Sequence, residues 1–96
     1  MKPFKLIYTP IAANFIKKIS PLPKKGLKAL VEELALSPYL GKPLVEELDG
    51  YRSLRYNKYR VIYKVDDEKK QIFILFAGPR KDVYQLFTDF FKKMRQ

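Results

Sequence analysis

Three segments in the second half of the chain have the apolar and aromatic pattern of strands, and the links between them are short. The segments are residues 51–55, 59–65 and 71–77, separated by residues 56–58 and by the charged run 66–70. Parallel neighbours would need a crossover of about a dozen residues or more, so links of this length predict antiparallel strands. This half of the chain is therefore predicted to form a three-stranded antiparallel meander.

The N-terminal part of the chain predicts one strand followed by two helices. Residues 4–8 alternate with the period of two that is typical of a strand, and Thr9 then offers an N-cap with Pro10 at the first helical position. Apolar residues recur at helical spacing over 11–19 and again over 27–35. A Ser-Pro-Leu-Pro segment separates these runs, and its prolines suit the first turn of a second helix. A helical hairpin is the predicted result.

A loop and a last helix complete the predicted fold. Residues 39–50 contain Gly41, Pro43 and an Asp-Gly turn signal, so they are predicted to be a loop leading to the sheet. Over residues 83–94, six apolar side chains recur along one helix face, which should pack on the sheet. The order is then β-α-α-β-β-β-α in an α+β fold. The length suits one domain, so residues 1–96 are predicted to form a single unit.

Two residue types that support many protein sites are missing from this composition. The chain has no cysteine and no histidine, so a disulfide framework and the common zinc and copper ligand sets are excluded. We expect no metal and no cofactor. The N-terminus has no long apolar segment, and no run approaches the roughly 20 apolar residues of a transmembrane helix. We therefore expect a cytoplasmic protein that does not act on membranes.

The charge balance predicts a polyanionic partner. Lys and Arg number 20 against 10 Asp and Glu, which gives a net charge of +10 and a pI near 9.8. This excess is larger than a small domain needs for solubility. RNA, DNA or an acidic protein segment is the predicted partner class.

The positive charge is densest over residues 51–65, where every formal charge is positive and four tyrosines are interleaved. Arginine can grip phosphate with two parallel hydrogen bonds and tyrosine can stack on unpaired bases, a combination that favours single-stranded nucleic acid. The alternative is that the tyrosines belong to the core, which the alternation of Tyr59, Tyr63 and Val65 on one face favours. The candidate RNA-binding residues are Arg52, Arg55, Lys58, Lys64 and Lys81.

Two arginines and a tyrosine occupy positions that suit a functional role. Arg60 lies among apolar strand neighbours, so its guanidinium should either find an acidic partner or face a functional cleft. A Gly-Pro turn delivers Arg80 to the start of the last helix, where the helix N-terminus also attracts anions. Tyr84 lies about 100° from the apolar stripe of that helix, so its hydroxyl is not required in the core. Alternatively, Arg80 pairs with Asp82 and Tyr84 is an exposed rim residue.

These segments resemble a known family. Tyr-Arg-Val-Ile-Tyr at 59–63 is followed by Ile-Phe-Ile-Leu at 72–75 and Arg-Lys-Asp-Val-Tyr at 80–84, and Leu-Asp-Gly-Tyr-Arg-Ser-Leu-Arg precedes them at 48–55. The pattern, which spans nearly the whole chain in element order, is similar to the RelE branch of the RelE/ParE toxins of bacterial type II toxin–antitoxin systems. The resemblance implies a sheet flanked by helices. It also implies cleavage of messenger RNA in the ribosomal A site, by attack of a 2′-hydroxyl on the adjacent phosphate, with inhibited translation and growth arrest.

The resemblance also assigns candidate catalytic residues. The family's strand arginine falls on Arg60, its turn arginine on Arg80 and its late tyrosine on Tyr84. The two arginines would neutralise charge that grows on the pentacoordinate phosphorane, and Tyr84 would handle a proton. Glu46 or Glu47, just before the sheet, is the alternative base.

One position departs from the family pattern. A pair of lysines is expected on the strand before Arg60, where this sequence has Arg52 and Arg55. These arginines can supply positive charge, but an arginine does not readily give up a proton at neutral pH. Acid–base catalysis by a lysine at this position is therefore in doubt. The pattern of relatives that use a histidine as general acid is also excluded, because the chain has no histidine.

Two other functions share the fold and the basicity. A ParE-like toxin would inhibit DNA gyrase without any catalytic residue, and a plain nucleic-acid-binding module would bind without forming a product. In either toxin hypothesis we expect an acidic antitoxin, which would fold over the basic surface and form a hetero-oligomer with the toxin.

Overall fold

The computed structural model describes residues 2–79 and 83–94. In chain order the described elements are β1 (Lys5–Tyr8), α1 (Pro10–Lys18), α2 (Pro21–Glu33), β2 (Lys42–Pro43), the 3-10 helix η1 (Glu46–Leu48), β3 (Arg52–Tyr56), β4 (Tyr59–Asp66), β5 (Gln71–Pro79) and α3 (Val83–Met94). The predicted α+β class is confirmed, as are the N-terminal strand, the helical hairpin and the C-terminal helix. No helix in this described part of the chain is long and apolar enough to cross a membrane.

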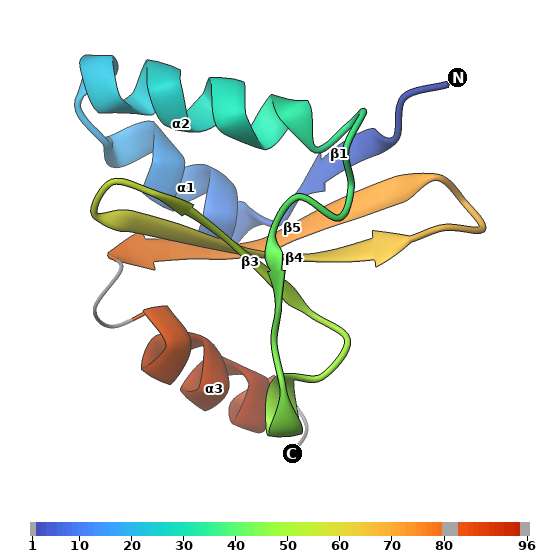
Figure 1. Cartoon of the computed structure of the whole chain (residues 1–96). Helices are drawn as coiled ribbons and strands as arrows, with labels where there is room; N and C mark the ends of the chain where they lie inside the picture. The colour runs from blue at the N-terminus through green and yellow to red at the C-terminus, as the bar shows by residue number, and fades with distance from the viewer. Residues whose placement is uncertain (1, 80–82, 95–96) are drawn as a thin grey trace.

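The strands form one sheet in the order β1-β5-β4-β3-β2. β3, β4 and β5 are antiparallel neighbours, which confirms the predicted meander. β1 runs parallel to β5, with Lys5 opposite Gln71. The helical hairpin that follows β1 therefore lies over the sheet before the chain returns at the opposite edge (Figure 1).

The prediction of a loop over residues 39–50 is wrong in two places. Lys42 and Pro43 form the short edge strand β2, paired with Ser53 and Arg52 of β3, and η1 follows. A proline is tolerated there because an edge strand leaves backbone donors unused on its outer side. A strand of two residues is too short to show a periodic pattern, so no local signal predicts it.

The hairpin between β3 and β4 is tighter than predicted. Tyr56 belongs to β3 and pairs with Tyr59, which leaves Asn57 and Lys58 as a two-residue turn. Asn57 has a φ of 51°, the left-handed conformation that such turns require and that asparagine tolerates. This turn fixes which residues of β3 face those of β4.

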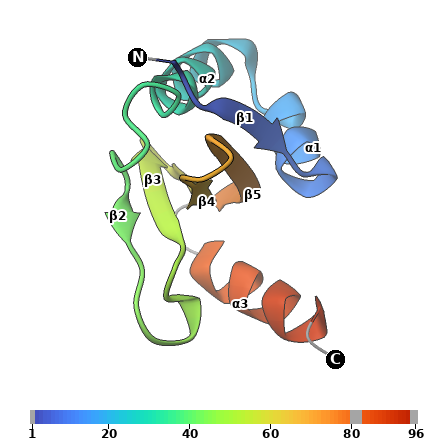
Figure 2. The same ribbon diagram turned by 90° about the vertical axis from the view of Figure 1, so that its right-hand side faces the viewer.

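Helices cover both faces of the sheet, α1 and α2 on one side and α3 on the other (Figures 1 and 2). The first core lies under α1 and α2 and includes Leu27, Val31, Val61, Tyr63 and Ile74. The second lies under α3 and contains the buried residues Ile62, Val83 and Phe87. Alternation along β4 thus sends Val61 and Tyr63 to one core and Ile62 to the other.

An irregularity in β5 is tied to the start of α1. Ile62 pairs with Phe76 and Tyr63 with Ile74, so Leu75 has no partner in this ladder. Such a bulge lets consecutive residues turn to one side, and Leu75 and Phe76 both pack against the second core. Thr9 caps α1 as predicted, accepting from Ala12 N at 3.2 Å, and its hydroxyl donates to Leu75 O at 2.7 Å.

The prediction that the strand tyrosines belong to the core is confirmed. Tyr63 is fully buried, and Tyr59 is half-buried against the first core. The Tyr63 hydroxyl donates to Pro38 O and accepts from Gly41 N, both at 2.8 Å. A Cβ at Gly41 would lie 2.7 Å from the Tyr63 ring, so glycine is required for this contact. Burial raises the pKa of the Tyr63 hydroxyl, and the Gly41 hydrogen bond partly offsets that rise.

Candidate functional site

Arg60 is the second residue of β4, and its side chain lies on the face of the sheet that α3 covers. It lies opposite Arg55 of β3 and Gly78 of β5, on the same side of β4 as Ile62. Because Ser53 of β3 lies opposite Ile62, it shares this face too. The short hairpin therefore brings a serine and two arginines to one end of one sheet face.

Arg60 joins two hydroxyl groups from different elements. Its Nη1 donates to Ser53 Oγ at 3.3 Å and to the hydroxyl of Tyr84, which lies in the first turn of α3. The Tyr84 hydroxyl in turn donates to Ser53 Oγ at 3.1 Å. The guanidinium carbon of Arg60 also lies 4.7 Å from the centre of the Tyr84 ring. We call Arg60, Ser53 and Tyr84 the arginine cluster.

The charge of Arg60 is not neutralised by these contacts. Both acceptors are uncharged hydroxyls, and Arg60 Nε is buried without a hydrogen-bond partner among the described residues. A half-buried guanidinium with an unused donor is costly unless an anion completes its shell. Of the two outcomes expected for Arg60, the contacts therefore favour a functional cleft.

Tyr84 is not an exposed rim residue. It is half-buried against the second core, and its hydroxyl is held within the arginine cluster. The residues that decide whether Arg80 faces the same cluster or pairs with Asp82 lie outside the described part of the chain, as does Lys81.

Ser53 was not singled out by the sequence prediction. It is 4% exposed and accepts hydrogen bonds from both Arg60 and Tyr84. The missing signal was the strand register: once a two-residue turn is placed at 57–58, Ser53 falls two positions from Arg55 on the face of Arg60.

The candidate RNA-binding residues separate into two groups. Arg55, which is exposed, lies directly opposite Arg60, and Lys58 is at the hairpin turn with its Nζ 5.7 Å from the centre of the Tyr59 ring. These two extend the positive charge at the end of the sheet that carries the arginine cluster. Lys64 lies further along β4, with its Nζ 5.7 Å from the centre of the Tyr51 ring.

Arg52 has a structural partner. Its Nε donates to Gly41 O at 3.1 Å, and its guanidinium carbon lies 5.0 Å from the centre of the Tyr39 ring. Alternation puts it on the sheet face opposite to Arg60, with Leu54 and Tyr56. The side chain therefore fixes the 39–41 segment against the sheet.

The alternative bases lie away from the cluster. Glu46 and Glu47 are exposed in η1, before the Arg52 end of β3, whereas Arg60 lies opposite Arg55 near the other end. Within the described residues, no group of three or more acidic side chains is placed to hold a metal ion. The arrangement offers a guanidinium that can bind an anion, next to a tyrosine hydroxyl and a serine hydroxyl.

Comparison with known proteins finds relatives of one kind. Residues 4–84 match the family described as the ParE toxin of type II toxin–antitoxin system, parDE. Toxin RelG of Mycobacterium tuberculosis is 36% identical over 88 residues, covering 86% of this chain and 98% of RelG. Toxin RelE of the same organism is 35% identical over 81 residues, covering 79% of this chain and 84% of that toxin.

Solved structures give the same result. A chain of the toxin–antitoxin complex RelBE2 from Mycobacterium tuberculosis is 35% identical, with a TM-score of 0.67 over 81% of this chain and 99% of that one. The isolated RelE toxin of E. coli has a TM-score of 0.70 over 95% of this chain and 98% of that one, and at 19% identity it shows the fold alone. From its sequence relatives and its fold, the chain belongs to the RelE/ParE superfamily of type II toxin–antitoxin toxins.

Proposed function

We propose that this toxin is an endoribonuclease that cleaves messenger RNA in the ribosomal A site and so stops translation. The observation that carries the proposal is the charge of Arg60, which is held by neutral hydroxyls and whose Nε has no hydrogen-bond partner within residues 2–79 and 83–94. A phosphorus centre in transfer between an attacking and a leaving oxygen gains negative charge, and a positively charged donor of this kind stabilises that charge. The similarity to toxins named RelG and RelE supports the same branch of the family.

In the proposed reaction, a ribose 2′-oxygen attacks the adjacent phosphorus and the 5′-oxygen leaves. One proton departs from the 2′-hydroxyl and another reaches the leaving oxygen. Arg60 binds the non-bridging oxygens as negative charge grows on the phosphorane, and Arg80, the turn arginine of the family resemblance, is the second cation of this proposal. The Tyr84 hydroxyl takes the 2′ proton while its own proton passes through water to the leaving 5′-oxygen, so the proton lost by the 2′-hydroxyl is balanced by the one that the leaving group gains. Ser53 Oγ, which accepts a hydrogen bond from Tyr84, holds the hydroxyl in place.

A cognate antitoxin completes the proposal. Several solved relatives are described as toxin–antitoxin complexes, RelBE2 and the E. coli RelBE complex among them. A chain with a net charge of +10 attracts an acidic segment, and such a segment silences the enzyme by covering the arginine cluster.

The test is induced expression in a bacterial host, with primer extension on a reporter messenger RNA. Wild type should give discrete cuts within codons, and Arg60→Ala, Arg80→Ala and Tyr84→Phe should lose them while the proteins stay folded. Lys69→Ala is the matched control, because Lys69 is an exposed cation at the far end of β4. Cuts that persist in all three variants would show that the site assignment is wrong.

A second candidate is inhibition of DNA gyrase without nuclease activity. It is favoured by the family description itself, which names the ParE toxin of the parDE system. The same experiment separates the two functions. Growth arrest with intact messenger RNA and an induced DNA-damage response would favour the gyrase target.

A further inference from the structure

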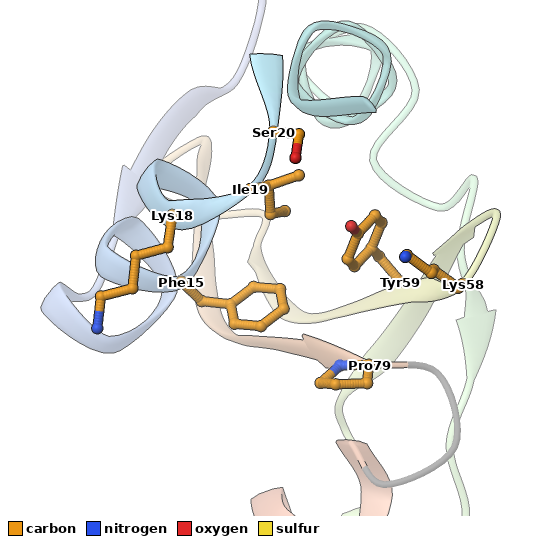
Figure 3. A pocket seen from close by; sticks show the side chains of 7 residues that line it. All are labelled: Phe15, Lys18, Ile19, Ser20, Lys58, Tyr59 and Pro79. Carbon is orange, nitrogen blue, oxygen red and sulfur yellow. The ribbon is translucent and has the colours of Figure 1, made fainter. Parts of the chain in front are cut away.

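A cavity of about 560 Å³ lies at the same end of the sheet as the arginine cluster, on the opposite face. Tyr59 and Pro79, which pair across β4 and β5, form one side, and Phe15 and Ile19 of the α1 segment form the other. Figure 3 shows the rings of Phe15 and Tyr59 directed towards each other across this space. Their centres are 6.0 Å apart with an edge-to-face angle of 69°. We call this cavity the aromatic pocket.

The charges around the aromatic pocket are positive. Lys18 and Lys58 line it, and its described lining includes no acidic residue. The Lys58 ammonium lies beside the Tyr59 ring, and Lys18 extends outwards past α1 (Figure 3). A cavity of nearly equal volume, about 540 Å³, lies at the other end of β4 and is lined by Asp66, Asp67 and Glu68. Size alone therefore does not distinguish the two, but their charge does.

An apolar aromatic wall with the Lys58 ammonium at its rim matches one ligand class. Unpaired bases stack on aromatic side chains, while a lysine at the edge of the platform contacts a neighbouring phosphate. An acidic peptide would use the lysine but leave the aromatic wall without a planar partner. The pocket volume lies within the range of small-ligand sites, which suits a single nucleotide.

The position of the pocket links it to the arginine cluster. Tyr59 and Arg60 are consecutive, so their side chains leave opposite faces of the same strand end. The rungs Tyr59–Pro79 and Arg60–Gly78 are adjacent in the ladder. An RNA strand that passes around this end of the sheet can contact both.

We propose that the aromatic pocket is a nucleotide-binding subsite, which holds one unstacked base of single-stranded RNA next to the scissile phosphate. The proposal rests on the ribonuclease function above and adds the residues that hold the flanking nucleotide. Because the Phe15 and Tyr59 rings stand at 69° to each other, the base stacks on one ring and contacts the other through its edge. Lys58 binds the phosphate of the captured nucleotide.

The test is a substitution that fills the aromatic pocket and leaves the core unchanged. Ser20 lines the pocket, is exposed, and makes no side-chain capping bond to α2, so Ser20→Phe fills the space without removing a structural contact. Ser20→Ala is the matched control at the same position. Binding is measured by fluorescence anisotropy with a labelled single-stranded RNA oligonucleotide and with an abasic oligonucleotide of equal length.

Loss of one base stack should weaken binding of the RNA to Ser20→Phe by roughly 5- to 100-fold. Ser20→Ala should bind as wild type does, and the abasic strand should bind all three proteins equally. Lys58→Ala should reduce the slope of log affinity against log salt by about 0.7, while Lys69→Ala, at the acidic end, should leave it unchanged. Equal RNA binding by wild type and Ser20→Phe, or equal weakening for the abasic strand, would overturn the subsite.

The source of the nucleotide is separated with purified ribosomes. If the base belongs to messenger RNA, Ser20→Phe should weaken binding only to ribosomes with message in the A site. If it belongs to ribosomal RNA, binding to message-free ribosomes should weaken equally.

Failure of the subsite is distinguishable from failure of the nuclease function. In the first case Ser20→Phe cuts messenger RNA normally and Arg60→Ala does not, and in the second case wild type makes no cuts.

Discussion

The two ends of the β4–β5 ladder differ in how their charges are satisfied. At the β4–β5 turn, on the right in Figure 1, Asp66 accepts a hydrogen bond from Lys69 N at 3.1 Å and Asp67 accepts one from the Tyr39 hydroxyl. At the β3–β4 hairpin, on the left, the acceptors of Arg60 among the described residues are neutral hydroxyls, and its Nε has no partner there. The first arrangement stabilises a turn and needs no ligand. The second leaves a cation able to bind an anion, which is why our proposal puts the function at the hairpin end.

After the loss of Arg60 itself, the largest effect should come from removing the Tyr84 hydroxyl at the hairpin end. Tyr84→Phe keeps the ring against the second core but removes the hydroxyl that handles the 2′ proton in the proposed reaction. We expect the cleavage rate on ribosomes to fall by roughly 100-fold or more, the usual contribution of a general acid or base. Circular dichroism and thermal melting should show an unchanged fold. A rate close to wild type would remove Tyr84 from the chemistry.

A smaller effect is expected at Ser53, which positions Arg60 and does not contact the substrate in our proposal. Ser53→Ala removes a shared acceptor from a buried position, so Arg60 loses one of its two anchors. We expect cleavage to slow by roughly 10-fold and the free energy of unfolding to fall by about 1 kcal/mol. Ser53→Thr keeps the hydroxyl and should recover much of the rate in the same ribosome assay. No recovery by threonine would argue against a positioning role.

A buried residue of β4 away from the arginine cluster allows stability to be tested separately from function. Tyr63→Phe leaves Gly41 N and Pro38 O without a side-chain partner, which should cost about 1–3 kcal/mol in urea unfolding. Burial raises the Tyr63 pKa above the ordinary value of 10.0, so the folded state favours the neutral hydroxyl. Stability is then fully present below about pH 10 and is lost as pH rises towards the folded-state pKa. Tyr63→Phe should lose part of this alkaline decline, and cleavage per folded molecule should not change.

The smallest effect should come from the acidic turn. Asp67→Asn removes a charge that accepts from the exposed Tyr39 hydroxyl, and the amide oxygen can still accept that bond. We expect cleavage and RNA affinity to stay within about twofold of wild type, as for surface changes in general. A marked loss of activity would mean that both ends of the ladder take part in function.

The main elements were predictable because their signals are local. Helical spacing over 27–35 and 83–94, and short links around the meander, identified two helices and three antiparallel strands. The parallel pairing of β1 with β5 was not predicted, because it joins segments more than 60 residues apart in sequence. The two-residue strand β2 has no period, and only its hydrogen bonds to β3 define it.

The candidate site was predictable in part. The family resemblance assigned Arg60 and Tyr84, and the structure brings these two into contact. Ser53 and the aromatic pocket could not be found from a sequence pattern, because both depend on strand register and on which face each residue takes. Arg52 illustrates the reverse case. Its charge suggested RNA, and its contacts with Gly41 and Tyr39 show a side chain that already has a structural partner.

The central claim is that the guanidinium of Arg60, which contacts neutral hydroxyls in the described structure, stabilises the phosphorane. The most direct measurement is single-turnover cleavage of messenger RNA on purified ribosomes at saturating toxin, comparing wild type with Arg60→Ala, and with Lys69→Ala as the charge-matched control. The rate for Arg60→Ala should fall by roughly 100- to 1000-fold with ribosome binding largely retained, the effect of removing one preorganised donor. An Arg60→Ala rate within a few-fold of wild type would contradict the claim.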